Sequence, residues 1–291
     1  MGIRLIKGLQ LREDAALRQS FFELAEQSFD LPLAQWYERG FWTEAYLPYA
    51  LADGQRILAN ISVNKIDLLL MGAPRRYLQL GTVMTAPSHR GQGLARHLMR
   101  QVLSDWQNSC DALYLYANAS VLEFYPKFGF ARAFEHEHAL RVAARPGDFA
   151  PIDPLGSAGQ ALLRRCYQKG NPFSLCSMPH NLGLVMFYCG SFLRSCALYS
   201  PRRDALCIAE PAGPGLLCYD IFCDPGQDLP EILGELSARD GGQVRLGFTP
   251  KNASGLRCAP ILEDDDALFI YKGGENPFEE HRLRLPLLSH A

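Results

Sequence analysis

The sequence lacks any apolar run long enough to cross a membrane, and its first residues lack the hydrophobic core of a secretion signal. They also lack the hydroxyl residue that a myristoylation motif requires. Charge of one sign is not in excess, since 29 basic residues stand against 31 acidic ones. This balance gives no electrostatic reason to expect a nucleic-acid or membrane partner. We therefore expect a soluble, cytoplasmic protein, and the sequence carries no signal of its oligomeric state.

Cysteine spacing typical of metal sites is also missing, because none of the nine cysteines forms a Cys-x-x-Cys pair. Eight of the nine lie in the second half of the chain. Without an export signal, we interpret them as reduced, small core residues rather than as zinc ligands. His136 and His138 alternate in a predicted strand, and we interpret them as exposed strand residues rather than as a metal pair. The sequence thus predicts no metal site.

One segment of the chain does carry a strong local pattern. Residues 77–85 are predicted to form a strand, which Pro87 ends, and a helix with apolar residues at helical spacing follows from residue 94. Between them lies Arg90-Gly91-Gln92-Gly93-Leu94-Ala95. Glycines tolerate left-handed torsions, and the first amide N–H groups of a helix have no partner within it. The segment is therefore a candidate pyrophosphate site, to which the arginine adds a fixed cation.

Arg90-x-x-Gly93-x-Ala95, preceded by a strand that ends Val83-Met84-Thr85, resembles the acyl-CoA signature of the GCN5-related N-acetyltransferase (GNAT) superfamily. A second landmark follows at the expected distance. Residues 112–118 are predicted as the next strand, and residues 120–130 resemble the family's helix that ends in Tyr, a basic residue and Gly-Phe. The resemblance covers residues 1–145. It implies the GNAT fold, an α/β (α+β) architecture around a mixed sheet, with acetyl-CoA as co-substrate.

The resemblance also implies a role for each motif residue. The backbone of Val83, Met84 and Thr85 would bind the pantetheine arm and the thioester carbonyl. The diphosphate would lie on the turn formed by Arg90, Gly91, Gln92, Gly93, Leu94 and Ala95. Asn118 would hydrogen-bond the pantetheine amides, or else cap the following helix. Tyr125, with a phenol pKa of about 10, would donate a proton to the leaving thiolate, or else pack as a core aromatic.

Pro126 departs from the family pattern, because it directly follows Tyr125. A proline is unusual inside a helix, so we expect it to shorten or bend the turn that carries the tyrosine.

No residue stands out from the sequence as the general base. The strand at residues 78–85 contains no carboxylate, although some family members place a glutamate there. Four side chains are candidates, although each is more commonly a solvated surface group: Glu44, Asp67, His89 and Glu123. A chain of water molecules could also serve. Some two-lobed relatives use the terminal carboxylate, and Ala291 could do so if the tail folds back.

Two helices are predicted before the acyl site, over residues 14–29 and 33–51. In the resembled fold the first helices line the acceptor side. The second stretch is rich in aromatic residues, which would form either a wall for an apolar or cationic amine or a buried stripe. Residues 56–70 and 77–85 are predicted to form an antiparallel meander.

The second half of the chain reads as a weaker copy of the first. It has a predicted strand at 215–223 followed by a proline, a short helix at 229–236 and a strand at 243–249. Acidic residues in Asp224-Pro225-Gly226-Gln227-Asp228 replace the arginine–glycine turn and would repel a pyrophosphate. The tandem arrangement resembles the two-lobed acetyltransferases related to the mycobacterial enhanced-intracellular-survival protein. We expect a catalytic domain at 1–145 and a degenerate, non-binding domain at 146–291 that walls the acceptor pocket.

Taken with the resemblance, these features predict an acetyl-CoA-dependent N-acetyltransferase. It would move the acetyl group directly to a primary amine of a small molecule or peptide. A non-catalytic acyl-CoA sensor is the alternative, and Tyr125 separates the two, since a binding module needs the glycine turn but not the phenol.

Overall fold

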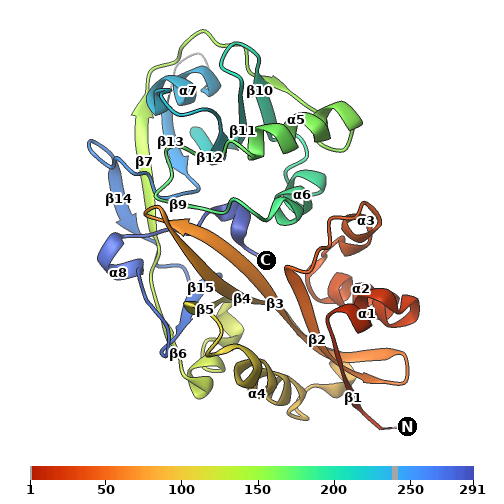
Figure 1. Cartoon of the computed structure of the whole chain (residues 1–291). Helices are drawn as coiled ribbons and strands as arrows, with labels where there is room; N and C mark the ends of the chain where they lie inside the picture. The colour runs from red at the N-terminus through yellow and green to blue at the C-terminus, as the bar shows by residue number, and fades with distance from the viewer. Residues whose placement is uncertain (1, 238–241) are drawn as a thin grey trace.

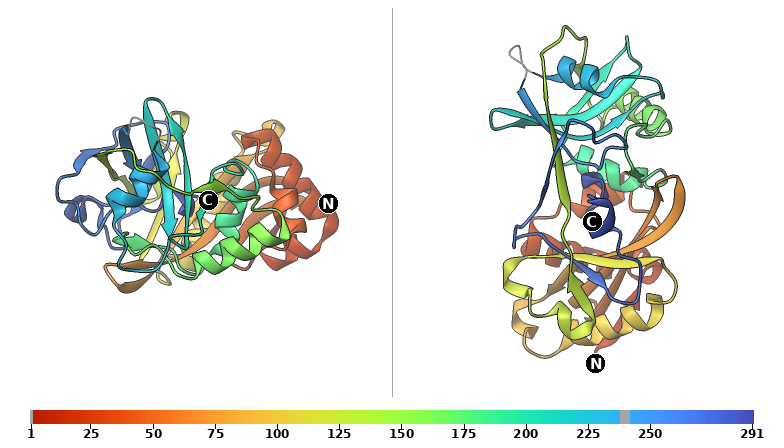
Figure 2. Two further views of the ribbon diagram at one scale, coloured as in Figure 1. Left: turned by 90° about the horizontal axis from the view of Figure 1, so that it is seen from above. Right: turned by 90° about the vertical axis from the view of Figure 1, so that its left-hand side faces the viewer.

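The protein, described here by a computed structural model of residues 2–237 and 242–291, has two lobes, each built on one mixed sheet (Figure 1, Figure 2). The first sheet has the order β1-β2-β3-β4-β5-β15-β6, with β9 paired to β3, and the second β14-β7-β13-β12-β11-β10-β8. The first comprises β1 (Arg4–Lys7), β2 (Tyr46–Asp53), β3 (Arg56–Leu70), β4 (Ala73–Thr85), β5 (Ala112–Ala117), β6 (Phe130–Arg132), β9 (Cys176–Ser177) and β15 (Ala267–Tyr271). The second comprises β7 (His136–Val142), β8 (Ala150–Pro151), β10 (Ala197–Ser200), β11 (Ala205–Ala212), β12 (Gly215–Phe222), β13 (Gly242–Leu246) and β14 (Arg257–Pro260). The expected mixed α/β fold is confirmed.

Helices cover both faces of the first sheet. The first-lobe helices are α1 (Leu9–Glu13), α2 (Ala15–Phe29), α3 (Leu33–Glu38) and α4 (Leu94–Trp106). The buried side of α4 carries Leu98, Met99, Val102 and Leu103, as its periodicity predicts. These residues belong to a different apolar cluster from that of α2 and α3, so α4 packs on the opposite face of the sheet.

The two lobes share one local topology around a parallel strand pair. In the first lobe β4 leads through α4 to β5, and β4 and β5 pair in parallel. In the second, β12 leads through α7 (Leu229–Leu236) to β13, and these strands also pair in parallel. The remaining second-lobe helices are α5 (Ser157–Tyr167), α6 (Leu182–Gly190) and α8 (Phe278–His281). The predicted strand–helix–strand repeat is therefore present, although β13 ends at Leu246 rather than at residue 249.

The sheets exchange strands across the predicted domain boundary. β7 precedes residue 145 but pairs with β13 and β14 of the second sheet. β15 lies near the end of the chain but pairs with β5 and β6 of the first. A division into 1–145 and 146–291 therefore does not follow sheet membership. Local patterns indicate that a strand forms but not which sheet receives it, which is why the sequence does not reveal this exchange.

The predicted helix over residues 33–51 is wrong beyond its first turns. α3 ends at Glu38, and residues 46–53 form β2 between β1 and β3. Pro48 lies inside β2, and proline is incompatible with a helix interior. Because nearly every residue of β2 is buried, its apolar run lacks the alternation that separates a strand from a helix.

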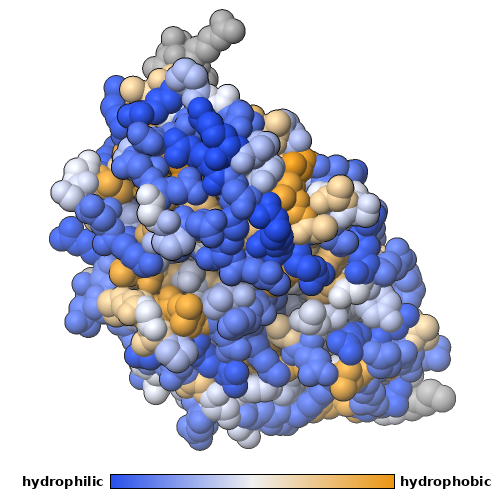
Figure 3. Space-filling model, turned by 45° about the horizontal axis from the view of Figure 1, so that its top comes forward, coloured by the Kyte–Doolittle hydropathy of each residue, from blue (hydrophilic) through white to orange (hydrophobic). Residues whose placement is uncertain are grey.

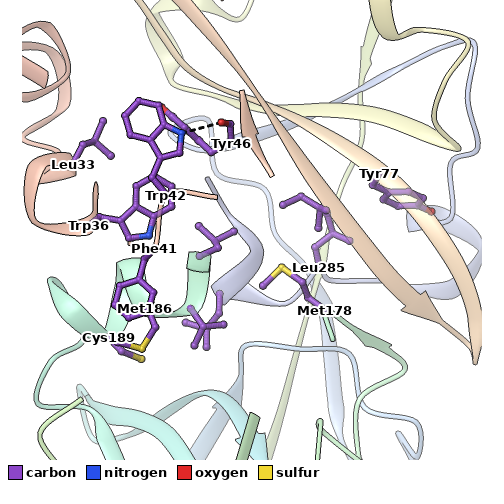
Figure 4. Packing of buried hydrophobic residues seen from close by; sticks show 14 of the residues in the cluster. Leu33, Trp36, Phe41, Trp42, Tyr46, Tyr77, Met178, Met186, Cys189 and Leu285 are labelled. Carbon is purple, nitrogen blue, oxygen red and sulfur yellow. Dashed lines mark hydrogen bonds between the residues drawn. The ribbon is translucent and has the colours of Figure 1, made fainter. Parts of the chain in front are cut away.

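Aromatic side chains of this region build the core between the lobes (Figure 4). Trp36 and Trp42 stack with ring centroids 6.0 Å apart, and Tyr46 meets both edge-on. Trp36 also donates a hydrogen bond of 2.7 Å from Nε1 to the carbonyl oxygen of Gly183 in α6. Of the two predicted roles for these residues, the buried stripe is the one that the structure shows.

The outer surface visible in Figure 3 is mostly hydrophilic, with apolar residues in small separate patches. Within residues 2–237 and 242–291, no helix is long and apolar enough to cross a membrane. All nine cysteines are free and all but two are buried. The described residues also contain no metal-type cluster of His, Cys, Asp and Glu.

Candidate active site

A cavity of 810 Å³ opens where β4 and β5 diverge. The two strands pair in parallel as far as Leu80 and Leu115, and the ladder ends there. β4 continues to Thr85 without β5 beside it, so this part of β4 borders the cavity. Backbone N–H and C=O groups that have left a ladder require new partners, and a ligand can supply them.

A β-bulge shapes β4 at the same place. Two of its residues, Thr82 and Val83, lie opposite the single β3 residue Ile61, and the φ angle of Thr82 is +48°. The Asn60 side chain donates a hydrogen bond of 2.9 Å to the carbonyl oxygen of Thr82. The hydroxyl groups of Tyr46 and Thr82 lie 2.9 Å apart. These contacts hold the bulge in place beside the cavity.

The glycine turn leads directly into α4. Gly91 and Gly93 have φ angles of +77° and +80°, in the left-handed region that favours glycine. In the described part of the chain no side chain caps the first turn of α4, so its N–H groups are available to an anion. Arg90 donates from Nε to the carbonyl oxygen of Thr85 at 3.2 Å, which ties the turn to the end of β4.

A groove of 440 Å³ runs along this turn and meets the cavity. Both hollows are lined by Thr85, Arg90, Ala95 and Phe124, so they adjoin. The path fits an elongated ligand with a diphosphate on the turn and a thioester between the strands. Each residue predicted to bind the cofactor borders the cavity or the groove: Val83, Met84, Thr85, Arg90, Gly91, Gln92, Gly93, Leu94, Ala95 and Asn118.

Tyr125 begins a single 3-10 turn, Tyr125–Phe128, rather than closing a longer helix. Pro126 accounts for this shortening, as predicted. The ring packs against Phe124, Phe130 and Phe269, with centroids 5.2, 6.3 and 6.0 Å away, and the residue lines the cavity. Burial raises the pKa of Tyr125 to about 12, so the phenol keeps its proton at neutral pH.

Asn118 caps the short 3-10 turn Ala119–Val121 at the end of β5. Its Oδ1 accepts hydrogen bonds from the backbone N–H of Ser120 at 3.1 Å and from the Ser120 hydroxyl at 2.6 Å. The capping role predicted from the sequence therefore applies to the side-chain oxygen of Asn118. Asn118 also lines the cavity, where its amide nitrogen can still donate to a ligand.

The candidate bases predicted from the sequence differ in their position relative to the cavity. Glu44 and Glu123 are exposed, and neither lines the cavity. Asp67 forms an ion pair with Arg76 at 2.8 Å. His89 borders the groove at the glycine turn, away from Tyr125. Ala291, by contrast, lines the cavity.

The C-terminal tail folds back between the two lobes, beside β3 and β4 (Figure 1). The N–H of Ala291 donates to Oε1 of Gln79 at 3.1 Å, and Nε2 of Gln79 donates to the Ala291 carbonyl oxygen at 2.9 Å. One residue earlier, the carbonyl oxygen of His290 accepts a hydrogen bond of 2.8 Å from the Tyr188 hydroxyl of α6. The condition set from the sequence, that the tail must fold back, is met.

Other site residues carry no signal in the sequence. Tyr116, Tyr188, Asp266 and His290 all line the cavity. The His290 ring stacks on Tyr116 with centroids 3.9 Å apart, and burial lowers the pKa of His290 to about 3. They come from four segments that meet only in the folded chain, so spacing along the sequence does not reveal them.

Glu135 fastens the start of the tail from inside the protein. It is buried, and its Oε1 accepts a hydrogen bond of 2.8 Å from the N–H of Leu285. Burial, only partly offset by this hydrogen bond and the nearby Arg284, raises its pKa from 4.5 to about 7. A raised pKa in the folded state means that this group favours folding fully below pH 4.5, and that the contribution is lost as the pH rises through 7.

For Glu135→Gln we expect a gain in the free energy of unfolding relative to wild type as the pH rises from about 4 to about 8. The gain should be roughly 3 kcal/mol at about 1.4 kcal/mol per pKa unit, because glutamine keeps the bond to Leu285 without a buried charge. Denaturant melts at both pH values measure it. Glu137→Gln on the half-exposed side of β7 is the control, and parallel pH profiles for Glu135→Gln and wild type would contradict the prediction.

Comparison with known proteins agrees with this geometry. Residues 14–133 match the family model of the acetyltransferase (GNAT) domain. No curated protein sequence matches the chain. Among solved structures, a probable N-acyltransferase from Enterococcus faecalis V583 is similar at 14% identity and a TM-score of 0.61, over 97% of this chain and 75% of that one.

Two further structures have the same two-lobed extent. A GCN5-related N-acetyltransferase from Kribbella flavida is 14% identical, with a TM-score of 0.55 over 92% of this chain and 70% of that one. Eis1 from Mycobacterium abscessus is 13% identical, with a TM-score of 0.53 over 93% and 73%. At such identities the likeness concerns the fold alone. The domain match includes the glycine turn, the splayed strands and Tyr125, so residues 14–133 are similar to an acetyltransferase (GNAT) domain.

Proposed function

We propose that the protein transfers the acetyl group of acetyl-CoA directly to a primary amine of a small molecule or peptide. The observation that carries this proposal is that one cavity is bordered by the bulged end of β4, Tyr125 and Asp266, and adjoins the glycine turn. A thioester between β4 and β5 would thus have an acid and a proton acceptor beside it, with its diphosphate on the turn.

The reaction needs two proton transfers. The amine nitrogen attacks the thioester carbonyl, a C–N bond forms and the C–S bond breaks. The nitrogen gives up a proton, and the leaving sulfur takes one from the phenol of Tyr125. Backbone N–H groups freed at the β4 bulge would stabilise the oxyanion. Burial in the same cavity would raise the pKa of the CoA thiol as well, which favours its protonation by the phenol.

Two titratable side chains that line the cavity with Tyr125 are candidates for the proton acceptor. His290 is a weak base, since its pKa is about 3. The side chain of Asp266 is 64% exposed, so its carboxylate can take the proton of the amine directly or through a water molecule. We assign the proton acceptor to Asp266.

The acceptor amine would enter from the side of the cavity away from the glycine turn. Ser28, Phe29 and Leu31, at and just after the end of α2, line the cavity but not the groove at the turn, and so does Tyr188 from α6 of the second lobe. The second lobe thus contributes Tyr188 to the wall of the cavity. We propose that it does so without binding acetyl-CoA itself.

In a thiol-release assay with acetyl-CoA and a mixed panel of amines, we expect at least one amine to yield free CoA and acetylated product in equal amounts. Mass spectrometry of the product distinguishes transfer from thioester hydrolysis. Omission of amine is the control and should leave only slow thiol release. Binding of acetyl-CoA without acetylation of any amine would contradict the proposal and favour the sensor alternative.

A further inference from the structure

Four side chains form a ring of hydrogen bonds behind the bulge of β4. Nδ2 of Asn60 in β3 donates to the Ser62 hydroxyl at 2.9 Å, and Ser62 donates to the hydroxyl of Tyr46 in β2, also at 2.9 Å. The ring closes on Thr82, whose hydroxyl lies 2.9 Å from that of Tyr46 and whose carbonyl oxygen accepts from Asn60 at 2.9 Å. Burial raises the pKa of Tyr46 to about 12, so its hydroxyl keeps a hydrogen to donate to Thr82.

Thr82 needs such support because its backbone is strained. Its φ angle of +48° lies in the left-handed region, where a β-branched side chain is disfavoured. Without partners for its hydroxyl and its carbonyl oxygen, the residue would relax towards an ordinary strand conformation and the bulge would shift. Torsions of this kind persist only where the surroundings fix them, and they concentrate at functional sites.

Asn60 is poorly suited to a role in stability alone. Its side chain is fully buried, and within residues 2–237 and 242–291 its Oδ1 atom has no hydrogen-bond partner. A buried acceptor without a partner destabilises the fold, and an apolar side chain of similar volume would avoid that cost. What an apolar side chain could not supply is the hydrogen bond from Nδ2 to Thr82.

That hydrogen bond sets the direction of a backbone N–H group at the cavity. The carbonyl of Thr82 and the N–H of Val83 belong to one planar trans peptide, in which the two groups point in opposite directions. With the carbonyl oxygen held by Asn60, the N–H of Val83 points away from Asn60. Thr82 and Val83 both line the cavity, beyond the last β4 residue that pairs with β5.

We propose that Asn60 is a positioning residue for acetyl transfer: with Tyr46 and Ser62 it holds the bulge so that β4 presents a backbone N–H to the thioester carbonyl oxygen. This inference rests on the proposed function in so far as the thioester lies at the bulge. A donor that is already directed at that oxygen stabilises the charge that develops there without reorganisation. The same donor polarises the carbonyl of bound acetyl-CoA before any reaction.

The test is infrared spectroscopy of acetyl-CoA that is isotope-labelled at its carbonyl carbon and bound to the 291-residue protein without an amine. In the wild type we expect the carbonyl stretch at a lower frequency than in free acetyl-CoA, because an aligned donor weakens the C=O bond. Asn60→Leu keeps the side-chain volume but cannot donate, so it should lose most of this shift. With an amine that is acetylated, kcat should fall about 10- to 100-fold, while the Kd for acetyl-CoA stays unchanged.

Asn64→Leu is the matched control, because Asn64 is also buried in β3 and donates to the carbonyl oxygen of Gln79 at 3.3 Å, before the bulge. It should keep the wild-type shift. Tyr46→Phe is a second variant, which removes one hydroxyl of the ring, keeps the aromatic packing and should lose part of the shift.

A full shift in folded Asn60→Leu, or an equal loss in Asn64→Leu, would overturn the positioning role. So would a wild-type frequency equal to that of free acetyl-CoA. If Asn60→Leu does not fold, an unchanged shift in Tyr46→Phe would overturn it instead. Because the frequency is read without an amine, a protein that binds acetyl-CoA but acetylates no amine still tests this inference, and the two failures are distinguishable.

Discussion

Gly93→Glu is expected to abolish detectable binding of acetyl-CoA. Gly93 precedes the first residue of α4 at a φ angle of +80°, and no other atom lies within 4 Å of a Cβ built there. The glutamate therefore fits sterically but brings its carboxylate to the notch where the diphosphate would lie. Two unit charges about 4 Å apart repel by about 4 kcal/mol at an effective dielectric constant of about 20, or about 1,000-fold in Kd. Calorimetric titration with acetyl-CoA measures the loss.

Matched controls separate charge from backbone strain. Gly93→Ala imposes a side chain on the same left-handed backbone without a charge, at a cost of roughly 1–2 kcal/mol, so it should retain measurable binding. Gly226→Glu places the same charge in the corresponding loop of the second lobe, where φ is +93° and the Cβ position is also open. It should leave the Kd for acetyl-CoA unchanged. Wild-type affinity in a folded Gly93→Glu protein would show that the diphosphate does not bind at this turn.

The second-lobe loop shows in structure why it should not bind a diphosphate. Oδ1 of Asp228 accepts a hydrogen bond of 2.9 Å from the N–H of Glu231, which caps the start of α7. Asp224 forms an ion pair with Lys169 at 2.7 Å. The corresponding N–H groups in α4 are left free for a ligand. The protein's own carboxylate thus takes the place that an anion would occupy.

The glycine turn was predictable from the sequence because its chemistry is local. Gly91 and Gly93 act through their own torsions, and α4 follows from apolar spacing within one segment. The β4 strand and the shortened turn at Pro126 were predictable for the same reason. The family resemblance therefore identified the residues that border both hollows.

The tail and the exchanged strands were not predictable, because they depend on contacts between distant segments. Gln79 and Ala291 are 212 positions apart in the chain. β15 joins β5 after the chain has passed through the whole second sheet. β2 was predicted wrongly as a helix for another reason. It is buried on both faces, so its sequence lacks the alternation of apolar and polar residues that identifies a strand. Sequence patterns record the environment of a residue but not the partner that creates it.

Tyr125→Phe is expected to lower kcat by about 100-fold or more, the usual effect of removing a general acid, while the Kd for acetyl-CoA stays the same. Burial is the sole cause of the raised pKa of Tyr125, and its ring packs among aromatic residues that phenylalanine suits equally well. The fold should therefore be unchanged. Because the pKa of Tyr125 is about 12, wild-type kcat should show no loss of the acid up to about pH 10, and the variant should remain slower throughout this range.

Tyr271→Phe is the matched control for this prediction. It removes a hydroxyl that donates to Gln107 at 2.8 Å outside the cavity, so it should leave kcat unchanged. A wild-type kcat for Tyr125→Phe would show that solvent protonates the leaving thiolate and that Tyr125 is only a packing residue. A lowered kcat with unchanged binding would instead separate the two motifs by function: the turn before α4 binds the donor, and the phenol after β5 releases its sulfur. Such a separation is what distinguishes an acetyltransferase from a module that only binds acetyl-CoA.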